Sequence, residues 1–464
     1  MTRVFSHIKS KKAYTSYILD CGASMEQINS LLSGYVMPLL LMGMGLILGF
    51  KMRFFYILHP IRTASLLFSG AKKGRGSPFS ALSQALAGTL GVGNMSGVAA
   101  AICSGGAGAV FWMWISALVA MSIKYFEVAL GQKHRRKGPR GYYGGAMYYI
   151  YDVFSPSFPR LAGVLGTSFA ILCIVNSLLT GNIVQTNCAA AALPSVPPLI
   201  TGAVLAFFVF IAIAGKIQRV SQVTSVLIPV LSAAYIILAL VIIIPSAGRL
   251  PSVLFDIISS AFSLRSAKGG IGGYLFLRAI RFGTTRGVFS NEAGSGTSPT
   301  AHAEANAKSP HSQGCFGIFE VFLDTIVLCT LTAFVILLSD GCRKGLGGIA
   351  LTVYAFSSRA GEFAGVAVGI SVILFAYATV ICQARYGTVA LQYVTKRRAP
   401  LHLYVLSVCA LCILGPLISE GVMWQMADLT VSLMTSANVL CLAYALSKGH
   451  LREILPKSEK RPSE

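Results

Sequence analysis

Residues 86–97 read LAGTLGVGNMSG and lie within an apolar run that extends from about Phe79 to Cys103. This run is long enough to cross a membrane, because about 20 residues span the hydrocarbon core. Its centre nevertheless contains several glycines and the amide of Asn94, and each glycine lowers helix stability by roughly 1 kcal/mol relative to alanine. The composition predicts a membrane helix interrupted at mid-depth, where protein or a water-filled cavity satisfies the freed backbone groups. The alternative is an uninterrupted helix that uses its small residues for close packing.

The composition of the whole chain is that of a polytopic membrane protein. Of its 464 residues, 55% are hydrophobic and only 12% are charged, whereas soluble proteins average about 25% charged residues. The net charge of +22 is also typical of nucleic-acid binding, but the basic residues follow the loops between apolar runs. When these runs are threaded alternately through a membrane, 23 of the 38 lysines and arginines fall on one side and six on the other. The excess indicates that the first side is cytoplasmic and includes the C-terminus.

The apolar runs divide the chain into five parts. We expect a polar, basic tail over residues 1–30, a first apolar helix with a basic cytoplasmic loop over 31–78, two inverted repeats over 79–245 and 246–447, and a cytoplasmic tail over 448–464. Repeats of opposite orientation are common in transporters. The basic N-terminal tail disagrees with this threading, which places it outside. Either the run 33–50 does not span the membrane, or the later helices dominate the orientation.

The symmetry mate of the first interruption should lie five spans later, between Val253 and Ser290. Two glycine clusters compete there, GGIGG at 269–273 and NEAGSG at 291–296. Three arginines separate the clusters, and arginine is disfavoured in the outer leaflet but tolerated at the cytoplasmic end. We therefore expect the first cluster, with Gly269, Gly270 and Gly273, to be the second mid-depth interruption, and the second cluster to lie at the cytoplasmic mouth.

Two interruptions of opposite sense suit a zwitterion. The N-terminus of a half-helix offers free N–H groups to a carboxylate, and the freed carbonyls suit an ammonium group or an alkali cation. Neither expected interruption contains an acidic residue, which mildly favours Na⁺ over H⁺ as the coupling ion. An enzyme is disfavoured, because Gly91 and Gly93 are followed by Gly97 and do not form a G-x-G-x-x-G motif.

Several motifs resemble those of the alanine or glycine:cation symporter family. They are GVGNMSGVA at 91–99, FWMW at 111–114, KYFE at 124–127, GGAMYY at 144–149, GNIVQTN at 181–187 and RGVFSNEAG at 286–294, with His302, Asp324 and Asp428 beyond them. The resemblance covers nearly the whole chain from about residue 30. It implies an all-α amino acid symporter with the five-plus-five inverted repeat of the sodium-coupled leucine transporter fold, about 11 transmembrane helices and two broken helices.

The chain departs from the family pattern at four positions. Val92 replaces the usual threonine, Ala378 replaces the usual serine or threonine before Thr379, Gln383 replaces the usual tryptophan, and Ala146 replaces the proline of the G-G-P-M-Y-Y motif. In the related fold the hydroxyl at the second of these positions binds sodium. Gln383 lies one helical turn beyond Thr379 and would face the substrate side chain. The amide widens the pocket and makes it polar, which suggests substrates other than, or broader than, alanine and glycine.

The motifs and the resemblance together give a set of candidate residues. For the substrate they are Gly91, Gly93, Asn94, Gln185, Gly269, Gly270, Gly273 and Gln383; for Na⁺ they are Gly88, Gly91 and Thr379; for a gate or structural network they are Asn291, Glu292, Gly294, Asp324 and Asp428. For each polar residue the alternative is an interhelical hydrogen bond.

The expected protein is a monomeric, multi-pass symporter of a bacterial inner membrane. It imports a small neutral amino acid with Na⁺, contacts the lipid bilayer, and uses neither a cofactor nor nucleic acid. Asp324 and Asp428 lie in apolar runs, and intramembrane carboxylates are candidates for proton relay. Proton coupling and an uncoupled channel or facilitator therefore remain the alternatives.

Overall fold

The structure, a computed structural model, describes residues 27–69, 76–139, 141–214, 218–262 and 270–456. Within these residues eight helices are long and apolar enough to cross a membrane, and a pair of helices bent by 60° forms a ninth span. The shorter apolar helix α11 (Pro198–Ala214) and the arginine-containing helix α14 (Gly270–Asn291) are not among these nine, but they complete the bundle and are grouped with the spans below. The expected all-α membrane fold is confirmed.

The first span precedes the repeats. It extends over residues 27–51, so the run 33–50 is part of a helix of spanning length. Its elements and the short helices that follow are η1 (Leu32–Val36), α2 (Met37–Lys51), α3 (Phe55–Leu58) and α4 (Pro60–Ser69). α2 packs against α7, where Val119 contacts Gly45 and the Ser122 hydroxyl donates to the Gly45 carbonyl at 2.6 Å.

The next five spans contain the first interrupted helix. Their elements are α5 (Pro78–Thr89), η2 (Val92–Asn94), α6 (Ser96–Gly105), α7 (Gly108–Lys133), α9 (Pro159–Leu178), η3 (Leu179–Ile183), α10 (Val184–Ala191), α11 and α12 (Gln218–Ile243). Between α7 and α9 lie α8 (Ala146–Phe154) and an antiparallel hairpin of β1 (Arg136–Gly138) and β2 (Gly141–Tyr143), with Arg136 opposite Tyr143.

The last five spans follow two connecting helices, η4 (Ile244–Arg249) and α13 (Leu250–Ala261). Their elements are α14, α15 (Ser298–His302), α16 (Pro310–Val321), η5 (Phe322–Cys329), α17 (Thr330–Leu338), α19 (Glu362–Val394), α20 (Ala399–Leu414), η7 (Gly415–Leu417) and α21 (Glu420–Ser447). The connecting elements are η6 (Gly341–Lys344) and α18 (Gly348–Ala360), and α22 (His450–Ile454) follows the last span.

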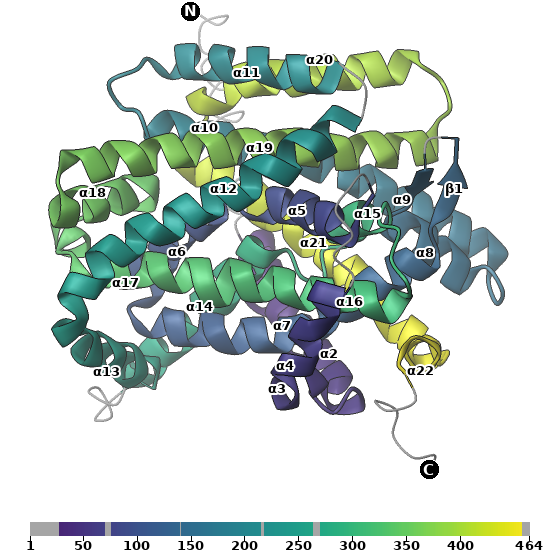
Figure 1. The fold of residues 1–464 in the computed structure, drawn as a ribbon, viewed down its shortest axis with the longest axis horizontal. Coiled ribbons are helices and arrows are strands. Elements are labelled where there is room, and N and C mark those ends of the chain that lie inside the picture. Colours follow the sequence, from purple (N-terminus) through teal and green to yellow (C-terminus); the bar gives the residue numbers. More distant parts are fainter. Residues whose placement is uncertain (1–26, 70–75, 140, 215–217, 263–269, 457–464) are drawn as a thin grey trace, which may run out of the picture.

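The bundle has two distinct ends (Figure 1). The hairpin end, at the right, carries β1, α8 and α22, whereas the opposite end carries α13 and α18. The α5–α6 span begins at the hairpin end and ends beside α13, where Gly108 lies against Ala261. The α14–α15 span runs the other way and returns to the hairpin end, where the Asn306 amide donates to the Gly76 carbonyl at 2.7 Å. The two spans are therefore antiparallel, as an inverted repeat requires.

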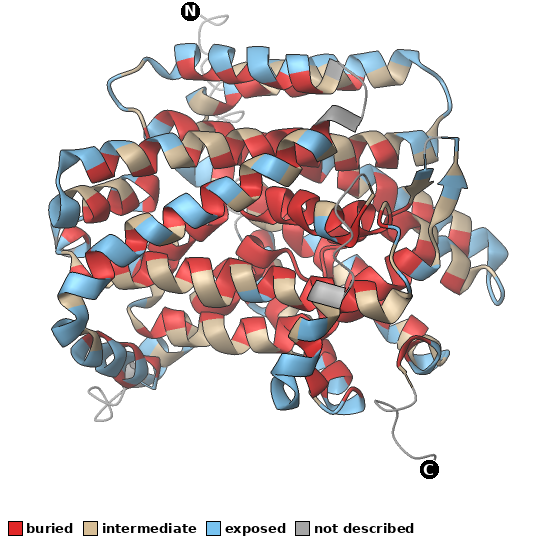
Figure 2. Ribbon diagram, viewed as in Figure 1, coloured by how far each residue is buried: buried red, intermediate tan, exposed pale blue. Residues whose placement is uncertain are grey.

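Burial follows the expected division between protein core and lipid (Figure 2). The central helices α5 and α15 are buried over almost their whole length, whereas outer helices such as α12 alternate between buried and exposed residues. Large apolar side chains are exposed on the outer helices, among them Phe207, Val226 and Ile237. In a membrane protein such residues face lipid tails.

The predicted position of the second interruption is wrong. Helix α14 runs without a break from Gly270 to Asn291, and Gly273 is exposed in its first turns; Gly269 lies outside the described residues. The chain instead leaves the helix at Glu292 and re-enters one at Ser298. The apolar piece before Gly269 is α13, a separate helix against the end of α7 and not an outer half-helix of this span.

The arginines on which the wrong placement of the second interruption was based have partners near the α13/α18 end. The Arg281 guanidinium lies against Gly34 and over the ring of Tyr35, both from the first span. Arg286 makes two hydrogen bonds to Asp428 of α21, at 2.8 and 3.0 Å. Ion pairs and aromatic contacts offset the cost of placing an arginine within the membrane, whereas contact with lipid alone does not.

Candidate functional site

The first interruption lies where the sequence predicts it. Helix α5 is capped at its start by the Ser77 hydroxyl, which accepts a hydrogen bond from the Ser80 amide at 3.1 Å. It ends at Thr89, and Gly91 then adopts φ −100° and ψ −147°, which is not helical. After one short turn, helix α6 resumes at Ser96 with a 60° change of direction. Every residue from Ala81 to Ala99 is buried, so protein surrounds the interruption.

Two polar side chains from other spans converge on Gly91. The Gln185 side-chain oxygen of α10 accepts a hydrogen bond from the Val92 amide at 3.1 Å. A Cβ on Gly91 would lie 2.5 Å from that oxygen and 2.7 Å from the Thr379 hydroxyl of α19. Glycine is therefore required because any side chain would occupy the space in front of these two oxygens. The structure brings the predicted residues Gly91, Gln185 and Thr379 together.

Helix α19 also contacts the carbonyls at the end of α5. The Thr379 hydroxyl donates to the Ala87 carbonyl at 2.9 Å, and the Gln383 amide donates to the Gly88 carbonyl at 3.3 Å. Oxygen atoms of this kind are the ligands that hard cations prefer. Ala87 was not among the sequence candidates, because a backbone carbonyl leaves no trace in the residue type.

Asn94 connects the first interruption to a buried carboxylate. Its amide nitrogen donates to the Asp324 side chain at 2.8 Å and to the Asp324 carbonyl at 3.0 Å. The same carboxylate accepts hydrogen bonds from Ser290 at 2.9 Å and from Thr325 at 2.8 Å. The Asn94 side-chain oxygen is buried and has no hydrogen-bond partner among the described residues. Gly93 lies against Ser290, so Asp324 links the two interrupted spans.

The second interruption, residues 292–297, begins with a strained backbone. Glu292 has φ +48°, a conformation that costs a residue with a side chain on the order of 1 kcal/mol or more. Its carboxylate accepts hydrogen bonds from Gln383 at 2.9 Å and from Thr297 at 2.5 Å. Gln383 thus joins the Gly88 carbonyl of the first interruption to Glu292 of the second. The expectation that both interruptions lack an acidic residue is therefore wrong, as is the placement of this cluster at the cytoplasmic mouth.

The remainder of the second interruption is held by its own polar groups and by α7. Asn291 accepts a hydrogen bond from the Ala293 amide at 3.0 Å and donates to Thr325 at 3.1 Å. The Glu127 carboxylate accepts a hydrogen bond from the Gly296 amide at 3.2 Å. Gly294 and Gly296 have φ near +79° and +78°, where glycine is unstrained.

Glu127 belongs to a fully buried charged cluster beneath the second interruption. Lys124 lies 3.6 Å from Glu127 and 3.3 Å from Glu320 of α16, and its ammonium donates to Ser298 at 2.7 Å. Glu320 also contacts His302 at 3.1 Å. The Lys124–Glu127 pair lies within the KYFE motif of the sequence, whereas Glu320 was not among the sequence candidates. Its presence inside an apolar run was a usable signal, because ionisable residues in spans are rarely without a role.

Between the interruptions and the α13/α18 end, aromatic and charged side chains fill the core. The rings of Phe289 and Trp424 meet edge to face with centroids 5.1 Å apart, and the Arg286 guanidinium lies 4.3 Å from the Trp424 centroid. Arg286 is held by Asp428. Helix α18 covers the start of α6, since Thr352 donates to the Met95 carbonyl at 3.2 Å.

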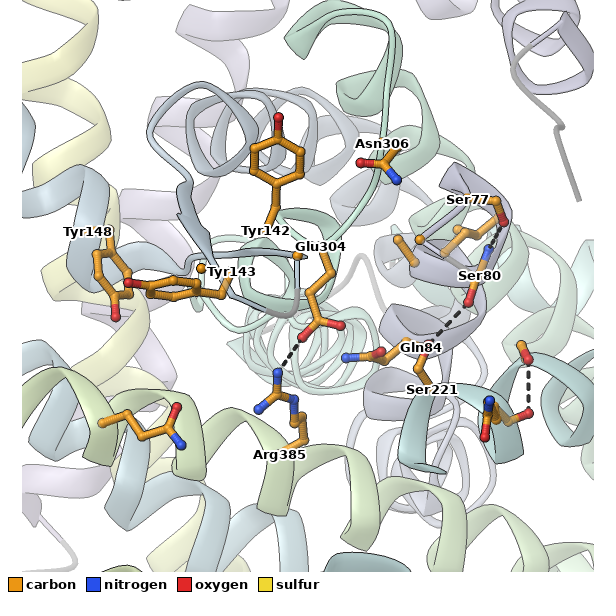
Figure 3. Close-up of a pocket in the computed structure, with 18 of the residues that line it drawn as sticks. Ser77, Ser80, Gln84, Tyr142, Tyr143, Tyr148, Ser221, Glu304, Asn306 and Arg385 are labelled. Atoms are coloured by element: carbon orange, nitrogen blue, oxygen red, sulfur yellow. Dashed lines mark hydrogen bonds and ion pairs between the residues drawn. The ribbon is translucent and has the colours of Figure 1, made fainter. Parts of the chain in front are cut away.

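Toward the hairpin end a cavity of about 1520 Å³ approaches the first interruption. Figure 3 shows its polar lining, which includes Gln84 of α5 and the pair of Glu304 with Arg385 at 2.8 Å. Ser80 and Ser221 meet across it at 3.1 Å. Gln84 is one helical turn before Gly88, and its carbonyl accepts a hydrogen bond from Cys382. The cavity therefore ends close to the Gly88–Gln383 contact.

An antiparallel pair of interrupted helices that face each other defines a class, the secondary transporters with the leucine transporter fold. The solved structure of MhsT in complex with L-phenylalanine has this fold and matches with a TM-score of 0.54 at 15% identity, covering 84% of this chain and 92% of that one. A substrate-bound Na⁺-coupled sialic acid symporter matches with a TM-score of 0.50 at 12% identity, covering 89% and 82%.

The chain belongs to the sodium:alanine symporter family, which matches residues 20–457. The sodium/alanine symporter AgcS of Methanococcus maripaludis is 35% identical, covering 91% of this chain and 94% of that protein. The probable sodium/glutamine symporter GlnT of Bacillus subtilis is 32% identical, covering 90% and 87%. The protein is therefore a multi-pass membrane transporter and not an enzyme.

Proposed function

We propose that the protein is a symporter that imports a small neutral amino acid with Na⁺ by alternating access. The observation that carries this proposal is the convergence of Gln185 and Thr379 on the backbone at Gly91. Membership of the sodium:alanine symporter family supports both the substrate class and the ion.

The substrate would lie against the first interruption. Its carboxylate would take N–H groups of residues 91–94 and of the α6 N-terminus, where the helix dipole is positive. Its ammonium group would take oxygen acceptors, one of which is the buried Asn94 side-chain oxygen, to which no residue in the described part of the chain donates. The Gln185 side-chain oxygen accepts a hydrogen bond from the Val92 amide in this structure. It would release that amide when the substrate carboxylate binds.

For Na⁺ we propose the carbonyls of Ala87, Gly88 and Gly91 with the Thr379 hydroxyl. The hydrogen bond from Thr379 to Ala87 supports this choice, because it brings two cation-ligating oxygens to 2.9 Å. Ala378 offers no second hydroxyl there, so the site relies on Thr379. Replacing Thr379 with alanine should abolish Na⁺ stimulation of uptake. Thr388→Ala is the matched control, because Thr388 lies on the same helix and its hydroxyl donates to the Ala384 carbonyl of that helix at 2.9 Å.

The substrate range would extend beyond alanine and glycine. Gln383 places an amide beside Glu292 and the Gly88 carbonyl, so the pocket presents polar groups to a substrate side chain. The similarity to a probable sodium/glutamine symporter is consistent with this range. Serine, threonine, asparagine and glutamine should compete with labelled alanine for uptake. Competition by alanine and glycine alone would contradict the pocket argument.

The test of the function is uptake of labelled alanine into proteoliposomes with and without an inward Na⁺ gradient. We expect accumulation above the external concentration only with the gradient. Proton coupling is the second candidate, because Glu292 lies within the second interruption and Asp324 links both spans. An inward proton gradient that drives accumulation without Na⁺ would favour it, and equilibration under every gradient would indicate a channel or facilitator.

We further propose a bacterial inner-membrane location with the hairpin end in the cytoplasm. Basic residues support this orientation, because Lys133, Arg136 and Arg385 all lie toward that end. The C-terminal helix α22 lies there too (Figure 1), so the C-terminus would be cytoplasmic. In this orientation the large cavity opens inward. The monomeric state and the boundaries 79–245 and 246–447 remain predictions.

A further inference from the structure

Two cysteines meet at the α13/α18 end of the molecule. Cys103 lies in the last turn of α6 and Cys342 in η6, and both are exposed as free thiols. The Cys103 thiol donates to the Leu346 carbonyl at 3.5 Å, four residues beyond Cys342, and it interacts with the Cys342 thiol. Cys103 therefore lies against the segment that carries Cys342, where a disulfide, with an S–S bond of about 2.05 Å, could join the two.

The segment that holds Cys342 is itself fixed to α18. The Tyr354 hydroxyl of α18 donates to Asp340 at 2.7 Å, and Lys344 bonds to the same hydroxyl at 2.5 Å. Leu351 and Tyr354 both lie against Gly341. A bond between the two cysteines would therefore attach α6, the outer half of the first interrupted span, to the η6–α18 unit.

This attachment would act on the closed end of the site. Helix α18 covers the start of α6 through the bond from Thr352 to the Met95 carbonyl, and Gly348 approaches the Ser96 hydroxyl. For a substrate to reach the first interruption from the α13/α18 end, α18 and α6 have to move apart. A covalent link between them would hold this end closed while the hairpin-end cavity stays open.

We propose that Cys103 and Cys342 form a reversible disulfide that locks the transporter closed at its α13/α18 end. The lock rests on the proposed function, but formation of the bond does not. In the proposed orientation this end faces the extracytoplasmic side, where disulfides form and persist. The other described cysteines are buried or half-buried, which leaves this pair as the accessible one in the described part of the chain.

The chemistry requires a disulfide oxidant such as oxidised glutathione. The interaction with Cys103 lowers the pKa of the Cys342 thiol, which favours Cys342 as the thiolate that reacts first. It attacks the oxidant, forms a mixed disulfide and releases one thiolate. Cys103 then loses its proton, attacks the Cys342 sulfur and releases the second thiolate. Two protein thiols are oxidised and one oxidant disulfide is reduced to two thiols.

The first measurement is independent of transport. The full-length protein in proteoliposomes is treated with oxidised glutathione, alkylated and digested without reductant, and mass spectrometry is used to find the peptide that joins Cys103 to Cys342. We expect this peptide in most of the wild type and in Cys409→Ser, a matched control on α20, and its loss after dithiothreitol. Cys103→Ser and Cys342→Ser should not form it. Absence of the bridge in the wild type would overturn the proposal.

The second measurement is alanine uptake by the same samples. Oxidation should lower wild-type uptake at least tenfold, with recovery in dithiothreitol, and should leave both serine variants unchanged. A bridged protein that transports as fast as the reduced one would overturn the lock. Failure of the reduced wild type to transport alanine would count against the proposed function instead, because the mass-spectrometric result stands without it.

Discussion

The two interrupted helices differ in where carboxylates meet them. Around the first, neutral oxygens of Gln185 and Thr379 face the backbone at Gly91. The Asp324 carboxylate accepts the Asn94 side-chain amide there, and the Asn94 oxygen has no hydrogen-bond partner among the described residues. Around the second, Glu292 is part of the interruption, and Glu127 binds the Gly296 amide from α7. The second is thus closed by protein carboxylates, whereas the first leaves neutral oxygens for a ligand. The two interrupted helices of an inverted pair therefore need not contribute equally to ligand binding.

The sharpest test of this difference is Gly91→Ala. The added Cβ would lie 2.5 Å from the Gln185 oxygen and 2.7 Å from the Thr379 hydroxyl, so both must move from the positions proposed for ligand binding. We expect alanine uptake to fall by about 100-fold or more, corresponding to roughly 3 kcal/mol, with little change in melting temperature.

The matched control for this variant is Gly97→Ala. Gly97 lies in the same span, but a Cβ there meets nothing within 4 Å, so uptake should persist. Wild-type uptake by Gly91→Ala would show that the first interruption is not the binding site.

The charged cluster beneath the second interruption should matter for stability. Lys124→Met leaves Glu127 and Glu320, both fully buried, without their ammonium partner, and the loss of one partner of a buried ion pair costs roughly 3–5 kcal/mol. We expect a clear fall in melting temperature in detergent.

Lys133→Met is the comparison for Lys124→Met, because its partner Glu453 is 59% exposed and exposed pairs contribute about 1 kcal/mol or less. Equal melting temperatures for the two variants would mean that the cluster does not hold the second interruption in place.

Gln383 is the side chain that touches both interruptions, so its replacement should change specificity. In Gln383→Trp the indole cannot reproduce the bonds to Gly88 and Glu292, and it narrows the pocket. We expect glutamine and asparagine to lose about tenfold in their ability to compete with alanine, about 1.4 kcal/mol, while glycine competes as before. An unchanged competition profile in Gln383→Trp would show that Gln383 does not line the substrate pocket.

The smallest expected effect lies outside both interruptions, at the hairpin. Burial alone would raise the pKa of Asp152, but hydrogen bonds from His134 and Arg136 outweigh it and lower the pKa below its ordinary value. A carboxylate with a lowered pKa stabilises the fold above its unfolded pKa and loses that contribution as the pH falls through its folded pKa.

We therefore expect the melting temperature to fall between pH 5 and pH 3, and to fall less in Asp152→Asn. The difference should be small, because Asp152 is partly exposed. An equal fall in melting temperature in the wild type and in Asp152→Asn would mean that other carboxylates cause the loss of stability in acid.

Most of the fold could be predicted from the chain alone. Runs of apolar residues long enough to span a membrane, glycines inside one of them, and the motifs around Asn94 and Glu292 are all properties of the sequence. These features gave the membrane class, the first interruption and the family. They act locally, because a glycine destabilises a helix wherever it occurs.

The second interruption could not be placed in this way. Arg278, Arg281 and Arg286 indicated a cytoplasmic half-helix. Arg281, however, packs on Tyr35, which lies about 250 positions earlier in the chain. Arg286 pairs with Asp428, which lies 142 positions later. Similarly, the sequence offered Asn94 as a ligand but did not show that Asp324 takes its amide.

The sequence by itself determined that the chain crosses a membrane many times and that one crossing is broken near Gly91, because composition and glycine content act within a single segment. Only the tertiary structure decided where the second crossing breaks, which carboxylates close it and which oxygens stay open. Those outcomes depend on partners from distant spans, whose contacts determine whether a buried charge or a strained residue such as Glu292 is tolerated.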